Sequence, residues 1–220
     1  MRTRTLLLGA VAGMTLAAPA LAARGSDGNV SIIYWQAPSI LNPYLSGGTK
    51  DGDASSLVIE PLARYNEKGE IVPWLVDTIP TVENGGVAED LTSITWKLTE
   101  GLVWSDGTAL TSTDVKFSAD YCMNPDGGCA QVPSYEGVTS VEIIDDLTVR
   151  VNFDGPKPFP YGPFVGGTTP IIQAAQFADC VGAAAPNCTE QNFNPIGTGP
   201  FRVVDIKPND VITCEANPNY

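Results

Sequence analysis

Short stretches in which hydrophobic and polar residues alternate dominate this chain, and such alternation is typical of half-buried β-strands. The clearest is residues 93–98, where Ile94, Trp96 and Leu98 alternate with polar residues. Three further pairs of strand-like stretches flank turn residues and predict strand–turn–strand units, at residues 65–73, 138–153 and 201–215. A β-rich run at residues 30–34 predicts one more strand, which leads into a Pro-containing loop.

Helical periodicity is confined to two segments. Residues 113–121 predict a helix, with Thr111 or Ser112 as the N-cap and Asp114 in the first turn. A weaker helical pattern covers residues 54–64 and is expected to end or kink at its proline. Because strands outnumber helices and helices interrupt them, the predicted fold class is mixed α and β.

The first 23 residues have the three parts of a secretory signal peptide. Arg2 and Arg4 supply positive charge, residues 6–16 are apolar, and a small-residue motif predicts a cut after Ala22 or Ala23. An uncleaved membrane anchor is the alternative, but the apolar run is shorter than the roughly 20 residues that span a bilayer. We therefore expect a periplasmic or secreted protein that is not inserted in the membrane after cleavage.

The composition is acidic and lacks histidine. Twelve Lys and Arg face 25 Asp and Glu, and the formal charge of −13 becomes −15 once Arg2 and Arg4 leave with the signal. This charge disfavours nucleic acid and anionic lipid as partners, because both need a basic surface. The absence of His excludes Ser-His-Asp and Cys-His catalysis and imidazole metal sites from this stretch. Glycine motifs that bind phosphates or dinucleotides are also missing.

Five cysteines fit an oxidising compartment. We predict the disulfides Cys122–Cys129 and Cys180–Cys188, because each pair brackets a span that is short and flexible enough to close. Closing the first loop contributes about 2.5 kcal/mol in the chain-entropy model. Cys214 is left over. The chain has neither a C-x-x-C pair nor a His, so we predict no metal site.

Carboxylates are abundant, and composition alone leaves a glycosidase-like acid pair open. Most are expected in solvated turns, as at Asp51, Asp53, Asp145 and Asp146. Asp106 is explained by turn chemistry and Asp114 by helix capping, with a catalytic role as the alternative.

Three motifs, in order along the chain, resemble one known family. The opening is EPLARY at residues 60–65 with GEIVPWL at 69–75, the signature is TWKLTEGLVWSDGTALTSTDV at 95–115, and the return to the first lobe is NPIGTGPF at 194–201. They resemble the peptide/nickel solute-binding proteins, bacterial extracellular solute-binding family 5. Thr99 is a departure, because the family usually has Arg or Lys there, and this weakens a structural ion pair.

The same motifs carry structural predictions. Trp96 and Trp104 lie on strand-like segments and are expected in the core. The run Ser105–Thr108 predicts a turn with a glycine at positive φ. Gly197 and Gly199 are expected to permit a tight crossing of the chain between lobes.

The resemblance implies a periplasmic-binding-protein-like, type II, bilobed α/β fold that closes around a solute. Residues 24–52 and 191–220 would belong to the main lobe and residues 53–190 to its inserted subdomain, while the second lobe would follow Tyr220. It implies a monomeric receptor, not an enzyme and without a cofactor, that captures peptides or peptide-like solutes and delivers them to an ABC permease. Alternatives are a receptor for a nickel chelate, opine, sugar or haem, a sensor partner, and, from another class, an exported hydrolase.

Peptide binders of this family hold the ligand backbone as an added strand. The matching loop here has glycines that allow close approach of a ligand, although a flexible turn is the alternative; it comprises Leu45, Ser46, Gly47, Gly48 and Thr49. Tyr135 stands at a position similar to a ligand-facing aromatic of the family. Tyr34 and Trp35 are further candidates, with core packing favoured for both. The acidic group that often captures the amino terminus of a peptide would belong to the second lobe.

Overall fold

The computed structural model describes residues 28–220, so the predicted signal peptide lies outside the described residues. The chain divides into two units, with the boundary after Ile33. The described part of the first unit has no regular secondary structure, and the strand predicted at residues 30–34 is wrong. A run of β-branched residues becomes a strand only where it fits against neighbouring strands, so its composition alone does not determine the outcome.

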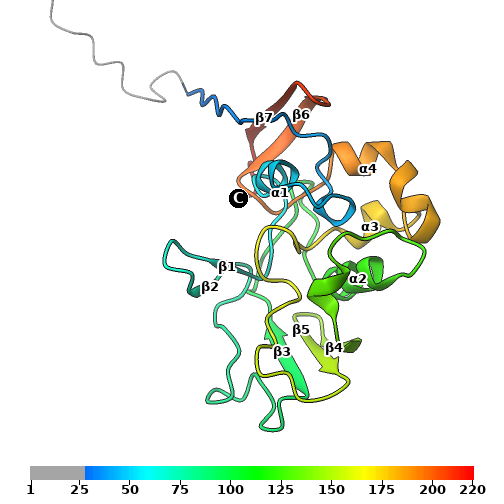
Figure 1. Cartoon of the computed structure of the whole chain (residues 1–220). Coiled ribbons are helices and arrows are strands. Elements are labelled where there is room, and N and C mark those ends of the chain that lie inside the picture. The colour runs from blue at the N-terminus through cyan, green and yellow to red at the C-terminus, as the bar shows by residue number, and fades with distance from the viewer. Residues whose placement is uncertain (1–27) are drawn as a thin grey trace, which may run out of the picture. The chain divides into compact units, whose positions relative to one another are not determined.

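The second unit, residues 34–220, contains three small antiparallel sheets (Figure 1). Two are hairpins, β1 (Ala63–Tyr65) with β2 (Ile71–Pro73) and β6 (Phe201–Lys207) with β7 (Val211–Ala216). The third has the order β3-β5-β4, formed by β3 (Ser93–Lys97), β5 (Thr148–Phe153) and β4 (Val138–Asp145). All three predicted strand–turn–strand units are confirmed. The alternation in β3 is also confirmed, because Ile94 and Trp96 are fully buried.

Helix α2 (Ser112–Met123) confirms the helix predicted at residues 113–121. At its start, the backbone N–H of Thr111 donates to Oδ2 of Asp114 over 2.9 Å. Ser112 joins this helix end to the β4–β5 turn, because its hydroxyl donates to the Asp145 carbonyl oxygen over 2.6 Å. Its N–H donates to the Asp146 carbonyl oxygen over 2.8 Å. The helix therefore packs against β4 and β5.

The other helical segments are short: η1 (Pro43–Leu45), α1 (Thr49–Ser55), η2 (Val132–Tyr135), α3 (Ala174–Phe177), η3 (Gly182–Asn187) and α4 (Thr189–Phe193). The helix predicted at residues 54–64 is wrong in its position, since α1 ends at Ser55. The apolar residues beyond it instead pair with a distant loop, as when the N–H of Leu62 donates to the Phe164 carbonyl oxygen over 2.9 Å. This long-range pairing takes the backbone donors that a helix would need.

The signature motif forms part of one hydrophobic core. Trp96 and Trp104 are buried in it, as predicted. In the turn that follows, Asp106 accepts a hydrogen bond from the hydroxyl of Thr108 over 2.6 Å, and Gly107 has the expected positive φ of 85°. Thr99, at the position where the family usually has a basic residue, donates its hydroxyl to Asp77 over 2.7 Å. At this position the chain therefore has a hydrogen bond, as expected from the loss of the basic residue.

Two disulfides close the predicted loops, Cys122–Cys129 and Cys180–Cys188. Cys214 on β7 is a free, half-buried thiol, and burial raises its pKa. Both predicted pairings are thus confirmed.

The predicted tight crossing joins the end of α1 to the start of β6 (Figure 1). Gly199 donates its N–H to the Val58 carbonyl oxygen over 2.8 Å, and Phe201 donates to that of Leu57 over 3.2 Å. A Cβ at Gly197 would overlap the Val58 carbonyl group. Only glycine fits at Gly197, because the two backbones approach each other too closely for a side chain.

Candidate functional site

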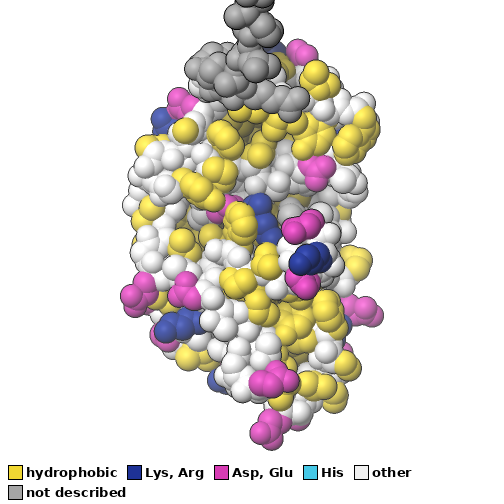
Figure 2. Space-filling model, turned by 90° about the vertical axis from the view of Figure 1, so that its left-hand side faces the viewer, with side chains coloured by type: hydrophobic (Ala, Val, Ile, Leu, Met, Phe, Trp, Pro, Cys, Tyr) yellow, Lys and Arg dark blue, Asp and Glu magenta, His cyan; other side chains and the backbone are white. Residues whose placement is uncertain are grey.

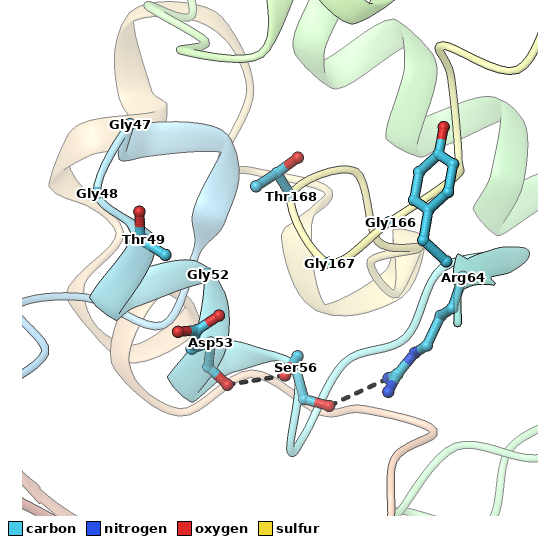
Figure 3. Close-up of a pocket in the computed structure, with 11 residues that line it drawn as sticks. Gly47, Gly48, Thr49, Gly52, Asp53, Ser56, Arg64, Gly166, Gly167 and Thr168 are labelled. Carbon is cyan, nitrogen blue, oxygen red and sulfur yellow. Dashed lines mark hydrogen bonds between the residues drawn. The ribbon is translucent and has the colours of Figure 1, made fainter. Parts of the chain in front are cut away.

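A cavity of about 340 Å³, which we call the glycine pocket, lies between three chain segments. It is lined by Gly47–Thr49 with Gly52, Asp53 and Ser56 around α1, by Arg64 and Tyr65 of β1, and by the loop Gly166–Thr168. Figure 3 shows the α1 side and the Gly166–Thr168 loop facing each other, with Arg64 extending from β1 toward Ser56.

Backbone pairing brings two of these segments together. Residues 60–63 run beside residues 164–171, with a parallel bridge between Ala63 and Val165. The Gly166 N–H donates to the Ala63 carbonyl oxygen over 2.9 Å, and the Ile171 N–H donates to that of Glu60 over 2.8 Å. Arg64 and the loop Gly166–Thr168 therefore lie next to each other, although about 100 residues separate them in the sequence.

The third segment is the turn before α1, and the side chain of Gln131 is hydrogen-bonded to it. The Gln131 side-chain amide donates to the carbonyl oxygens of Pro43 and Ser46 over 3.1 and 3.0 Å. These two bonds fix the exit of η1, so the orientation of Gly47 and Gly48 is set by a residue that follows the disulfide loop.

Asp51 also stabilises this turn through hydrogen bonds, although it was expected in a solvated turn. That expectation is wrong, because Asp51 is 1% exposed in the first turn of α1. Its carboxylate accepts from the Ser46 hydroxyl over 2.6 Å and from the Ser39 N–H over 2.6 Å, and it pairs with Lys50 over 3.0 Å. Burial alone would raise the pKa of Asp51, but these hydrogen bonds outweigh it, and the pKa is lowered.

Arg64 is held in place by an aromatic ring. Its guanidinium carbon lies 4.1 Å from the centre of the Trp74 ring. The indole Nε1–H of Trp74 donates to Oε1 of Glu60 over 2.6 Å, and the Thr198 hydroxyl donates to the other oxygen, Oε2, over 2.9 Å. Burial lowers the pKa of Arg64, while the nearby Glu60 carboxylate acts in the opposite direction. Glu60 and Trp74 also line a second cavity, of about 330 Å³, which is separate from the glycine pocket.

The structure distributes the predicted binding residues unevenly. Gly47, Gly48 and Thr49 line the glycine pocket, whereas Leu45 and Ser46 lie just outside its lining. The Gly47 N–H and carbonyl group make no hydrogen bond within residues 28–220. The turn therefore presents free backbone groups beside the pocket, as a strand-pairing site requires.

The predicted aromatic residues do not line this pocket. Tyr135 is buried, and its hydroxyl lies 3.0 Å from that of Tyr44, whose own proton goes to the Pro170 carbonyl oxygen over 2.6 Å. Tyr34 and Trp35 are in ring contact with each other. Trp35 is 72% exposed and Tyr34 is only half-buried and outside the hydrophobic core, so the core packing favoured for both is wrong. Burial raises the pKa of Tyr34, with an added contribution from the charge of Asp53 at the pocket.

Sequence reasoning missed several lining residues, chiefly Asp53, Arg64 and the loop Gly166–Thr168. The expectation that Asp53 lies in a solvated turn is wrong, because it lies within α1 and lines the pocket. Arg64 belongs to the opening motif, but no neighbouring residue in the sequence indicated that its side chain faces a cavity. The doublet Gly166-Gly167 repeats the Gly47-Gly48 pattern, but the same doublet occurs at residues 85–86 and 127–128, so it does not single out the pocket loop.

The wider surface adds little to the candidate chemistry. On the face shown in Figure 2, acidic side chains are dispersed among basic and hydrophobic ones. Residues 28–220 contain no group of three or more acidic or cysteine side chains placed to hold a metal ion. Within the same range, none of the helices is both long and apolar enough to span a bilayer.

Comparison with known proteins gives consistent matches. A glutathione-binding protein of Pectobacterium atrosepticum is 24% identical over 99% of this chain and 39% of its own length. A putative ABC transporter peptide-binding protein of Brucella ovis is 28% identical over 93% of this chain and 37% of its own length. The chain thus spans about two fifths of the curated relatives that it matches.

The fold is also that of solved structures. The oligopeptide-binding protein AppA of Bacillus subtilis, in complex with a nonapeptide, superposes with a TM-score of 0.71 at 24% identity, covering 84% of this chain and 35% of AppA. This confirms a mixed α/β fold that corresponds to part of such structures.

The family model described as bacterial extracellular solute-binding proteins, family 5 Middle, matches residues 70–220, more than half of the chain. That family consists of binding proteins and not of enzymes. The chain belongs to the bacterial extracellular solute-binding proteins, family 5.

Proposed function

We propose that this protein is the extracytoplasmic substrate-binding component of an ABC importer, capturing peptides or peptide-like solutes and delivering them to membrane permease subunits. Membership of a solute-binding family supports the receptor role. Relatives named for glutathione and for peptides support the solute class.

The observation that carries the proposal is the free backbone of Gly47 beside the glycine pocket. An added peptide strand needs an unpaired N–H and carbonyl group, and Gly47 has both free within the described chain. A Cβ built at Gly47 meets no atom within 4 Å, so the approach to this backbone is open. Main-chain bonds of this kind give affinity whatever the side chains of the solute are.

The proposal also covers the lobe organisation of the chain. We infer that residues 24–52 and 191–220 belong to the main lobe, and residues 53–190 to its inserted subdomain. Contacts between the two outer segments support this: the Leu41 N–H donates to the Asn192 carbonyl oxygen over 2.9 Å, and the Asn42 amide donates to the Asn192 side chain over 2.8 Å. A monomer exported by the N-terminal signal completes the proposal.

The test uses the protein expressed from its complete reading frame. Mass spectrometry identifies solutes that co-purify, and thermal shift measures stabilisation by a random tripeptide library. We expect intact peptides in the first measurement and a raised melting temperature in the second. Recovery of a nickel chelate, opine, sugar or haem would favour the alternative receptor, and cleavage of the peptides would favour a hydrolase.

A matched pair of variants tests the role of the Gly47 backbone. Gly47→Pro removes the N–H, and Ser46 before it already has the extended backbone that a following proline requires (φ −140°, ψ 135°). Gly47→Ala keeps the N–H. We expect Gly47→Pro to bind peptides about 10-fold more weakly and Gly47→Ala to bind like the wild type. Equal binding by both would contradict strand pairing at this residue.

A further inference from the structure

The guanidinium of Arg64 has more hydrogen-bonding capacity than the described chain uses. Nη2 donates to the Ser56 carbonyl oxygen over 3.2 Å, and Nε is buried without a partner. The nearest carboxylate oxygen, Oε1 of Glu60, lies 3.7 Å from Nη2, which is too far for a hydrogen bond. Arg64 nevertheless lines the glycine pocket, with 25% of its side chain exposed.

Glu60 forms an ion pair with Arg64 at 3.7 Å, but its hydrogen bonds go to other residues. Its two carboxylate oxygens accept from Trp74 and from Thr198, and the residue is 2% exposed. In this arrangement Glu60 fixes the Trp74 ring, and the ring fixes the plane of the Arg64 guanidinium stacked on it. The cation is therefore held in one orientation before any solute arrives, and such preorganisation favours binding.

The charge balance of the pocket indicates what Arg64 would bind. Among the described residues that line the pocket, Arg64 is the single cation and Asp53 the single anion. One guanidinium fits a carboxylate, which matches the spacing of its N–H groups and carries one negative charge. A phosphate would place close to two negative charges in the same space as Asp53.

We propose that Arg64 binds a carboxylate group of the captured solute and thereby selects acids over their neutral derivatives. The assignment rests on the proposed function and adds the chemical class of the group that enters the glycine pocket. Asp53 acts in the opposite direction, because its negative charge repels the same group. Removing the charge of Arg64 should therefore weaken the binding of acids, and removing the charge of Asp53 should strengthen it.

The experiment titrates the full-length protein with two random tripeptide libraries that share a free amino terminus. One library has a free carboxyl terminus, and the other is amidated there. We expect the wild type to bind the acids about 10- to 100-fold more strongly than the amides. Arg64→Met should lose this preference, Arg64→Lys should keep part of it, and Asp53→Asn should bind the acids more strongly.

Lys116→Met is the matched control, because it also removes one positive charge but lies on α2 in an exposed pair with Asp120. It should keep the full preference for acids. If the wild type binds both libraries equally, or if Arg64→Met retains the preference while melting like the wild type, the assignment is wrong. If Arg64→Met does not fold, the signs for Arg64→Lys and Asp53→Asn decide. Binding of neither library by the wild type would instead overturn peptide capture, and the assignment with it.

Discussion

The side-chain amide of Gln131 donates a hydrogen bond of 3.0 Å to the carbonyl oxygen of Ser46, directly before the glycines of the candidate binding turn. Gln131 follows Cys129 by two residues, and its neighbour Ala130 donates its N–H to the Tyr44 carbonyl oxygen over 2.7 Å. Hydrogen bonds from the residues that follow the disulfide loop therefore hold the binding turn in place.

Replacing Gln131 with Met tests this connection. The substitution leaves two carbonyl oxygens without their donor, and we expect a loss of about 1–2 kcal/mol in the free energy of unfolding. Hydrogen exchange should rise in residues 46–48, measured by mass spectrometry. Gln191→Met is the control, because the Gln191 side chain makes no hydrogen bond within residues 28–220 and should tolerate the change. Unchanged exchange in the turn would show that Gln131 does not support it.

Removing the Cys122–Cys129 disulfide should have a related effect. The double variant Cys122→Ala/Cys129→Ala releases a span with a sequence separation of 7, and the expected cost is about 2–3 kcal/mol of unfolding free energy. Urea denaturation measures this cost directly. Because Gln131 follows Cys129 by two residues, faster exchange should extend to residues 43–48. Wild-type stability in the double variant would contradict a structural role for the bond.

The crossing of α1 and β6 gives a steric prediction. Gly197→Ala places a methyl group on the Val58 carbonyl group, and we expect a loss of roughly 3 kcal/mol or a failure to fold. Gly47→Ala is the matched control, since its Cβ meets nothing within 4 Å. Thermal melting of both variants separates a steric clash from a general effect of replacing glycine. Equal melting temperatures would refute the clash.

Local sequence patterns predicted most of the regular elements. The alternation around Trp96 and the capping residues of α2 act over a few positions, so they can be seen in the sequence. Helix α1 was misplaced because its sequence has no apolar periodicity, while the apolar residues after it are drawn into pairing with residues 164–171. Long-range contacts decided that segment.

The site was less accessible to sequence reasoning. The turn Gly47–Thr49 was identified through resemblance, but Arg64 owes its orientation to Trp74 and Glu60, and Glu60 in turn is bound by Thr198 from the far end of the chain. Asp51 looked like a turn residue because its partners, Ser39 and Ser46, become neighbours only after folding. No local pattern contains these relationships.

The buried carboxylate of Asp51 predicts a pH dependence. Its pKa is lower in the folded state than the value of about 3.9 in an unfolded chain, so it stabilises the fold at higher pH. That contribution is present above about pH 4 and is lost as the pH falls through the lower folded-state pKa. Asp51→Asn should cost about 2 kcal/mol at pH 7. The difference in unfolding free energy between wild type and variant should shrink below pH 4, and a difference that stays constant would contradict the prediction.

We propose that the glycine pocket forms one wall of the solute site. Hydrogen exchange of the full-length protein, with and without the solute that co-purifies with it, tests this proposal. We predict that the solute slows exchange in both residues 47–49 and residues 166–168, which the structure places across the same pocket. Protection confined to other segments, with neither of these two affected, would show that the glycine pocket is not part of the solute site.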